Sequence, residues 1–294
     1  MQNLTTIIFL TLLISQTCPN LFGQNDINLP IKKVESKDWS PLLDENLSQW
    51  EVWTGVPEPK IKNLPQHYKK DEDGKNKTPI GLGDPMGIFK VIEEENGELV
   101  LNISGEVYAG LTTKKNYSNY HITLLFKWGE KKYEPRLDRK RDNGLLYHCH
   151  GEHGAFWNVW KSSLEYQIQE GDFGDLFTLA GTKATVNVDE EGKWNPYSEK
   201  LNKSIRTIRK VNAESPHGEW TRVDLYVVGD SAIHMTNEKV VMALTNIQTK
   251  DGKKLDTGQI QLQSEGADCF MKDINIRPIL EFPDWIKNEA GFKR

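Results

Sequence analysis

Histidine and carboxylate side chains that could transfer protons gather in residues 142–171. This stretch holds His148, His150 and His153, three of the seven histidines in the chain, and Glu165 follows them. Histidine and glutamate are frequent general acids and bases in enzymes. Imidazole and carboxylate groups also bind divalent cations such as zinc or manganese. The residue types therefore predict proton transfer or metal-assisted chemistry in this stretch.

The same stretch alternates polar and apolar residues as a β-strand requires. A strand over residues 164–169 would place Glu165 and Gln167 on one face and apolar side chains on the other, because successive side chains of a strand point to opposite faces. A second strand over residues 145–150 would carry His148 on its polar face. Two such faces side by side predict a site for a polar ligand. An ordinary solvated sheet face is the alternative.

Residues 258–263 (GQIQLQ) repeat this alternation near the end of the chain. Ile260 and Leu262 would point to a core, and Gln261 and Gln263 to the opposite face. Amide side chains suit sugar hydroxyls because each offers both donors and an acceptor. The glutamines therefore predict a polar, concave sheet face that binds a carbohydrate.

Many other short strands separated by turn residues are expected along the chain. The predicted ranges are 89–93, 98–104, 120–128, 222–228, 232–235, 239–244 and 267–278. Such a series favours an all-β sandwich. Only residues 197–211 could form a helix.

The chain begins with a stretch that we interpret as a secretion signal over residues 1–23. Its apolar run, residues 7–15, is too short to span a bilayer comfortably, and polar sequence follows at once. We therefore expect export to the periplasm or the outside. Lipid anchoring at Cys18 is the less favoured alternative. No transmembrane stretch follows the signal.

The rest of the chain divides into a lead-in, one folded domain and a tail. Residues 24–37 form the lead-in, residues 38–281 the domain, and residues 282–294 a peripheral tail. Within the domain, residues 56–87 contain five prolines and little periodicity, which indicates a loop insertion. The loop could form a wall over the site or decorate the surface.

Charge and cysteine content narrow the function classes. A net charge of −5 and a pI near 5.9 argue against a nucleic-acid or anionic-membrane surface. The basic run at residues 136–141 is interpreted as solvated loop charge. After removal of the signal, Cys149 and Cys269 remain, and their spacing establishes neither a disulfide nor a zinc site.

Six motifs occur in order along the domain and resemble those of a known family. They are LLDENLSQWEVW, GLTTKKNYSNYHITLLFKW, DNGLLYH, LEYQIQEG, GEWTRVDLYVVGDSAIHMTNEKVV and GQIQLQSEGADCFMKDINIRPI. Together they resemble the 3-keto-disaccharide hydrolase domain family of secreted proteins. The resemblance implies a concanavalin/laminin-G-like jelly-roll sandwich.

The resemblance also implies a reaction, the cleavage of glycosides whose C3 hydroxyl a separate oxidoreductase has oxidised to a ketone. Such a ketone acidifies the C2 proton, and the C1 leaving group lies β to it. A base can therefore remove the C2 proton and the enolate can expel the aglycone, with or without later addition of water. This chemistry needs a base, a positive charge or donor at the enolate oxygen, and an acid for the leaving group.

Candidate catalytic residues follow from these needs. Glu165 and His148 are candidates for the base and for an enolate or metal ligand. His234 is a further candidate because of its position in the family motif, and Lys127 could supply positive charge to the enolate. His148, Glu165 and His153 are candidate ligands of a divalent metal ion, whose presence the sequence leaves open.

Candidate substrate ligands lie on the expected polar face and in the loops beside it. They are Asn143, Gln167, Gln261, Gln263, Glu265 and Trp157. Two other function classes remain open, a non-catalytic carbohydrate-binding module and a conventional glycosidase with two carboxylates. The sequence does not name the sugar, the aglycone or the oligomeric state.

Overall fold

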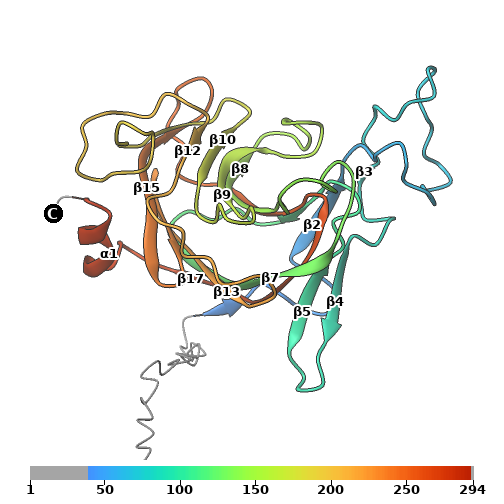
Figure 1. Ribbon diagram of the computed structural model, residues 1–294, viewed down its shortest axis with the longest axis horizontal. Helices are drawn as coiled ribbons and strands as arrows, with labels where there is room; N and C mark the ends of the chain where they lie inside the picture. Colours follow the sequence, from blue (N-terminus) through green and yellow to red (C-terminus); the bar gives the residue numbers. More distant parts are fainter. Residues whose placement is uncertain (1–38, 293–294) are drawn as a thin grey trace, which may run out of the picture. The chain divides into compact units, whose positions relative to one another are not determined.

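The structure is a computed structural model that describes residues 39–292. The predicted secretion signal and lead-in lie outside the described residues. Within residues 39–292 the chain forms two antiparallel sheets and one short helix, α1 (Asp284–Glu289) (Figure 1). The predicted all-β, concanavalin/laminin-G-like jelly-roll sandwich is confirmed. No helix in this part of the chain is long and apolar enough to cross a membrane.

A nine-stranded sheet forms one layer of the sandwich. Its order is β11 (Lys183–Thr185), β15 (Lys239–Gln248), β14 (Ser231–Thr236), β13 (Thr221–Val228), β7 (Tyr120–Lys132), β17 (Ala267–Pro278), β5 (Leu99–Ile103) and β4 (Phe89–Glu93), and β1 (Ser40–Pro41) pairs with β17. β4 and β17 coincide with the predicted ranges, and β7 runs beyond its predicted end at Trp128.

An eight-stranded sheet forms the other layer and carries most of the predicted site residues. Its order is β12 (Arg206–Thr207), β10 (Leu176–Leu179), β9 (Ser162–Gln167), β8 (Gly144–His150), β16 (Gln259–Ser264), β6 (Ala109–Thr113), β2 (Trp50–Thr54) and β3 (Gly81–Leu82). β8 lies between β9 and β16, with Leu146 opposite Glu165 on one side and Gln261 on the other. The two polar strands of the sequence prediction are therefore separated by one strand.

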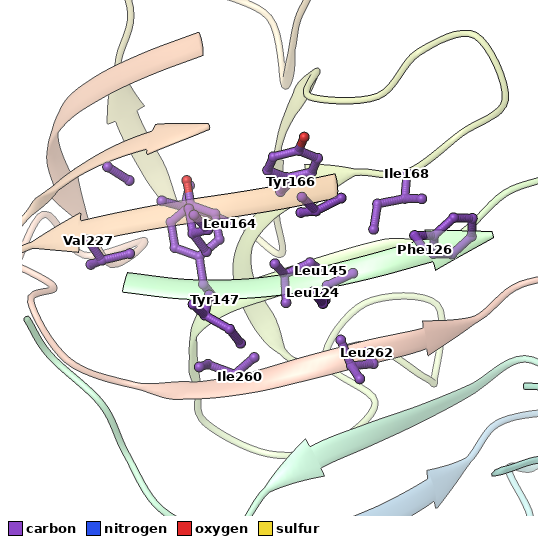
Figure 2. Close-up of a cluster of buried hydrophobic side chains, with 14 of the residues drawn as sticks. Leu124, Phe126, Leu145, Tyr147, Leu164, Tyr166, Ile168, Val227, Ile260 and Leu262 are labelled. Carbon is purple, nitrogen blue, oxygen red and sulfur yellow. The ribbon is translucent and has the colours of Figure 1, made fainter. Parts of the chain in front are cut away.

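The hydrophobic core lies between the sheets and includes the apolar half of each alternating strand. Figure 2 shows part of it. The buried side chains of the eight-stranded sheet there are Leu145, Tyr147, Leu164, Tyr166, Ile260 and Leu262, and those of the nine-stranded sheet include Leu124, Phe126 and Val227. The predicted inward face of residues 164–169 and 258–263 is thus confirmed.

The alternation of β8 breaks at His148. His148 has a φ of 50°, and the pairing of β8 with both neighbours shifts around it, which marks a β-bulge. After the bulge, the positions of β8 that point into the core and those that point outward are interchanged. Cys149 packs with Leu146 in a second hydrophobic cluster, while the Nε2 atom of His148 lies 3.1 Å from the carbonyl oxygen of Gly229, in the turn between β13 and β14 of the opposite sheet. The prediction that His148 shares a face with Glu165 is wrong.

Two peripheral segments differ from expectation. Residues 197–211 form turns and the short strand β12 rather than a helix. The expected C-terminal tail instead contains α1, and Phe282, Ile286 and Ala290 are buried as part of the main core. The apolar residues of this segment explain the difference, since they add to the core when the helix forms.

His234 is sealed inside the sandwich as a neutral side chain. Its Nδ1 lies 3.1 Å from the carbonyl oxygen of Gly174, and its Nε2 lies 2.9 Å from the hydroxyl of Tyr147. Because a carbonyl can only accept, Nδ1 donates to Gly174 and Nε2 accepts from Tyr147. Burial lowers the pKa of His234 to about 3. The side chain is therefore part of the core, and its predicted catalytic role is not supported by its position.

We expect His234 to make the fold less stable in acid. Between pH 6.5 and about 3 the unfolded histidine binds a proton that the folded one excludes. The free energy of unfolding should therefore fall with decreasing pH, by up to about 1.4 kcal/mol per pH unit from this residue. Urea unfolding of the wild type and of His234→Gln at pH 7, 6 and 5 measures the difference in slope.

A matched control is His67→Gln, which changes an exposed histidine. This variant should keep the slope of the wild type. An unchanged slope in His234→Gln would contradict the assignment of a neutral, buried imidazole.

Candidate functional site

The face of the eight-stranded sheet that turns away from the core carries Glu165, Gln167, Gln261 and Gln263, and we call it the amide face. These residues alternate along β9 and β16 with residues of the core. All four are buried, and Glu165 is only 5% exposed. The structure thus brings together the carboxylate and the amides that the sequence placed on one face.

Gly144 makes the close packing on this face possible. It lies on β8 between the two polar strands, opposite Gln167. A Cβ atom at this position would overlap the Oε1 atoms of Glu165 and Gln263. The bare backbone of a glycine therefore leaves the space in which the carboxyl group and the amide meet.

Two further carboxyl groups and one guanidinium adjoin Glu165. Arg136 forms ion pairs through Nη2 with both Asp142 and Glu265. The side chain of Gln169 donates to Asp142 at 2.6 Å. We call Arg136, Asp142, Glu165 and Glu265 the carboxyl cluster. The interpretation of Arg136 as a solvated loop charge is wrong, since its charge is held against this cluster.

Burial and mutual repulsion hold protons on these carboxyl groups. Burial raises the pKa of Glu165 well above its usual value, the charges of Glu265 and Asp142 raise it further, and Arg136 opposes the rise. Burial also raises the pKa values of Asp142 and Glu265. One guanidinium does not balance three neighbouring carboxylates, so these carboxyl groups bind a proton more tightly than isolated ones do. A carboxyl group with a raised pKa is a general acid while it holds its proton and a stronger base once it has lost it.

The glutamine side chains of the amide face differ in which of their hydrogen-bonding atoms lack a partner. The Nε2 of Gln261 donates to Thr112 at 2.8 Å, and its Oε1 accepts from the backbone nitrogen of Lys161 at 3.3 Å. Gln167 and Gln263 each keep a buried Oε1 atom with no hydrogen-bond partner among the described residues. These two glutamines, rather than Gln261, retain free polar atoms on this face.

Asn143 uses its amide inside the fold. Its Nδ2 donates to the carbonyl oxygen of Gln263 at 2.7 Å, and its Oδ1 accepts from the backbone nitrogen of Gly144 at 2.8 Å. It therefore positions the strands that carry the site. Its predicted contact with substrate is not supported by this geometry.

Lys161 is a cation on the amide face that the sequence reasoning missed. It precedes Glu165 by an even number of residues, next to β9, and is 6% exposed. Within residues 39–292 no ion pair or hydrogen bond of its ammonium group is found. Its charge lowers the pKa values of His153 and Cys149, so it lies near both. A cation without a protein counter-ion on a face of carboxyl and amide groups is available to a negatively charged group of a ligand.

His153 lies elsewhere on the eight-stranded sheet. Its Nε2 is 3.1 Å from Glu51, and its ring stacks on Trp53 with a centroid distance of 5.3 Å. His148 belongs to the opposite side of the sheet. The three candidate metal ligands, His148, Glu165 and His153, therefore do not converge. In residues 39–292 no group of three or more His, Cys, Asp or Glu side chains is arranged to hold a metal ion.

Lys127 does not lie in the site either. Its neighbours Phe126 and Trp128 point into the core, so Lys127 points away from the core on the outer face of the nine-stranded sheet. Its ammonium lies 4.6 Å from the ring centroid of Trp220. The prediction that Lys127 neutralises an enolate is wrong, because the core separates it from Glu165.

A pocket of about 220 Å³ lies beside the carboxyl cluster. Its walls are Val56, Pro57, Glu58, Pro59, Asn76, Tyr108, Trp157 and Val159. The loop insertion therefore does form a wall, and its base is closed where Ile80 donates to the carbonyl oxygen of Gly55 at 3.1 Å. Trp157 is 62% exposed and has a φ of 53°, a conformation that an aromatic residue rarely adopts.

Tyr108 links this pocket to the carboxyl cluster. Its ring lines the pocket, and its hydroxyl accepts a hydrogen bond from the Nε of Arg136 at 3.3 Å. A larger cavity of about 740 Å³ lies between residues 188–192 and 200–204, away from these side chains. Cys149 and Cys269 are both buried and unpaired. The candidate site is therefore the amide face, the carboxyl cluster and the adjoining pocket.

The fold is a two-sheet β-sandwich domain with a polar outer face on its eight-stranded sheet. A family model described as a 3-keto-alpha-glucoside-1,2-lyase-like domain matches residues 38–277. The chain belongs to this family. No curated protein matches the chain.

Several solved structures resemble this one at low sequence identity. One from Parabacteroides distasonis ATCC 8503, provisionally named a glycosyl hydrolase, is 15% identical with a TM-score of 0.48, and the match covers 84% of this chain and 98% of that one. A second from the same organism, with the same provisional name, is 16% identical with a TM-score of 0.44, covering 82% and 99%. A carbohydrate-binding module from Bacillus subtilis is 8% identical with a TM-score of 0.40, covering 64% and 91%.

Lys161→Met should raise the pKa of His153. Burial lowers this pKa, and the positive charge of Lys161 lowers it further. The substitution removes that charge and keeps a side chain of similar length. NMR titration of the imidazole measures this shift.

Lys161→Arg is the control, since it keeps the positive charge. It should leave the pKa of His153 low. An unchanged pKa of His153 in Lys161→Met would contradict the placement of the ammonium group near the imidazole.

Proposed function

We propose that this domain cleaves 3-keto-glycosides by removing the C2 proton and eliminating the aglycone from C1. The observation that carries the proposal is the position of Glu165, a buried carboxyl group with a raised pKa on a face lined by amides. Family membership supports a carbohydrate-active enzyme that acts on glycosides. The removal of the C2 proton by Glu165 is the part that we propose.

Each part of the site has a role in this proposal. Glu165 takes the C2 proton, since burial and its negatively charged neighbours raise its pKa and make its carboxylate a stronger base. The free Oε1 atoms of Gln167 and Gln263 accept hydrogen bonds from sugar hydroxyls. Lys161 takes the role expected of Lys127, because its unpaired charge on this face suits the negative charge of an enolate.

The two alternative functions fit the side chains less well. A conventional glycosidase needs two carboxyl groups on either side of the scissile bond, separated by roughly 5 to 9.5 Å. Here Asp142 and Glu265 share Arg136 with each other and face Glu165 across the same cluster. A binding module would need only amides and aromatic rings, and it would have no use for a buried carboxyl group with a raised pKa.

The proposal requires an oxidised substrate, so a separate sugar 3-oxidoreductase must act before this domain. Water can add to the unsaturated product, which makes the overall outcome a hydrolysis. Without that addition the enzyme is a lyase. Product analysis by NMR in labelled water distinguishes the two outcomes.

We further propose that the protein is exported by its first 23 residues to the periplasm or the outside. The apolar run followed by polar sequence supports this. N-terminal sequencing of protein recovered outside the cytoplasm should find Gln24 as the first residue. A chain that keeps residues 1–23, or one that carries lipid at Cys18, would contradict cleavage after Gly23.

Replacement of the base tests the mechanism. Glu165→Gln keeps the shape of the side chain and should keep sugar affinity, while release of aglycone from a 3-keto-glucoside falls by about a hundred-fold or more. Steady-state assays on matched oxidised and unoxidised glycosides measure this. Glu93→Gln is the control, since it makes the same change at an exposed position of β4. Unchanged turnover in Glu165→Gln refutes the role of Glu165, and activity on the unoxidised glycoside alone favours a conventional glycosidase.

The acid side of the pH–rate profile gives a second readout of the same base. Activity should rise with pH as Glu165 loses its proton. Arg136→Met removes the charge that lowers the pKa of Glu165, so the midpoint should move to higher pH. Glu265→Gln removes a charge that raises it, so the midpoint should move to lower pH. Shifts of about one pH unit in opposite directions are expected.

A further inference from the structure

Tyr108 lies between the carboxyl cluster and the pocket. Its hydroxyl accepts from Arg136, and its ring forms part of the pocket wall. We infer that the pocket is the aglycone subsite for a single aromatic ring, and that Tyr108 donates its hydroxyl proton to the departing oxygen. This inference rests on the proposed function and adds the acid and the class of aglycone.

The hydrogen bonding of Tyr108 leaves its proton free. The bond from Arg136 occupies a lone pair of the hydroxyl oxygen, and among residues 39–292 no acceptor of the hydroxyl proton is found. Burial and the nearby charge of Glu265 raise the pKa of Tyr108 to about 12, so the group keeps its proton at neutral pH. Arg136 stands where it would stabilise the phenolate left after proton transfer.

The side chain is also held in place. The Tyr108 ring stacks on the buried Trp160 with a centroid distance of 6.1 Å and an interplanar angle of 23°. Its carbonyl oxygen accepts from the backbone nitrogen of Gly55 at 2.8 Å, at the base of the loop insertion. A proton donor fixed in this way needs little reorganisation during the reaction.

The proposed step balances without an added reactant. Glu165 takes the C2 hydrogen as a proton, and the electron pair of the C2–H bond forms the C1–C2 double bond. The C1–O bond breaks, and the oxygen of the aglycone leaves with the electron pair of that C1–O bond and takes the proton of Tyr108. The sugar becomes an unsaturated ketone and the aglycone a free alcohol or phenol. Solvent water then restores the protons, and no oxidant is needed.

The pocket walls indicate the aglycone class. Val56, Pro57, Pro59 and Val159 supply apolar surface, and Trp157 adds an exposed aromatic ring. The volume of about 220 Å³ is below the roughly 300 to 1,000 Å³ of pockets for drug-sized ligands, yet above the ~150 Å³ of an apolar cavity that holds benzene. One ring therefore fits. The polar groups of the wall include the carboxylate of Glu58 and the amide of Asn76. The Nδ2 of Asn76 donates to the carbonyl oxygen of Pro57 at 3.0 Å, while its Oδ1 has no partner among the described residues and is placed to accept from a hydroxyl on the ring.

The test uses 3-keto-glucosides of p-nitrophenol, phenol and cyclohexanol, which differ in leaving-group basicity more than in size. Tyr108→Phe should slow release of cyclohexanol by about a hundred-fold or more, because this poor leaving group needs the proton. Release of p-nitrophenol should slow by less than about five-fold, since its anion leaves unaided. An equal loss across the series, or no loss, overturns the role of Tyr108. Circular dichroism and thermal unfolding confirm that the variant is folded.

Trp157→Ala tests the pocket. The ratio of kcat/KM for the phenyl over the methyl 3-keto-glucoside should fall by about ten-fold, mainly through KM for the phenyl compound. Calorimetry with p-nitrophenol alone should show binding to the wild type and weaker binding to the variant. Preference for a 3-keto-disaccharide over the phenyl compound, or an unchanged ratio, overturns the aglycone assignment. If the wild type releases none of the aglycones although p-nitrophenol binds, the proposed function fails and the inferred proton transfer fails with it.

Discussion

The charge balance around Arg136 is the constraint on which the candidate site depends. One guanidinium holds Asp142 and Glu265 directly and limits the rise in the pKa of Glu165. It also donates to the hydroxyl of Tyr108. Because the cluster is buried, each of these groups feels the charge of the others strongly. The protonation of the site is therefore a property of the whole cluster rather than of Glu165 alone.

Much of the fold follows from the alternation of apolar and polar residues along the sequence. The apolar residues of β9 and β16 point into the core, and the glutamates and glutamines between them share the other face. This holds because a strand has a period of two residues whatever its partners are. The same rule failed at His148, where a single residue with positive φ exchanges the two faces of β8. A bulge is set by pairing with neighbouring strands, so the period of one strand could not reveal it.

Three residues of the site, Arg136, Lys161 and Tyr108, were not predicted from the sequence, and the reason is not a bulge. Arg136 stands in a run of loop charges that looks solvated, and only the folded chain brings it onto Asp142 and Glu265. Lys161 could have been found, since it precedes Glu165 by an even number of residues on the same strand face. Tyr108 gave no local signal at all. Its role depends on residues far along the chain, and such pairings are invisible in a sequence pattern. In contrast, Glu165 and Gln263 were found because each belongs to a regular strand.

The closed base of the loop insertion has a consequence for how such domains diversify. Ile80 and Gly55 are joined by a backbone hydrogen bond, so residues 56–79 leave and rejoin the sandwich at one point. The entropy needed to close a loop grows only slowly with its length. Chains that lengthen, shorten or exchange this segment can therefore change the shape of the pocket at little thermodynamic expense. Glu165, which is anchored on β9, would keep its position while the preferred aglycone changes.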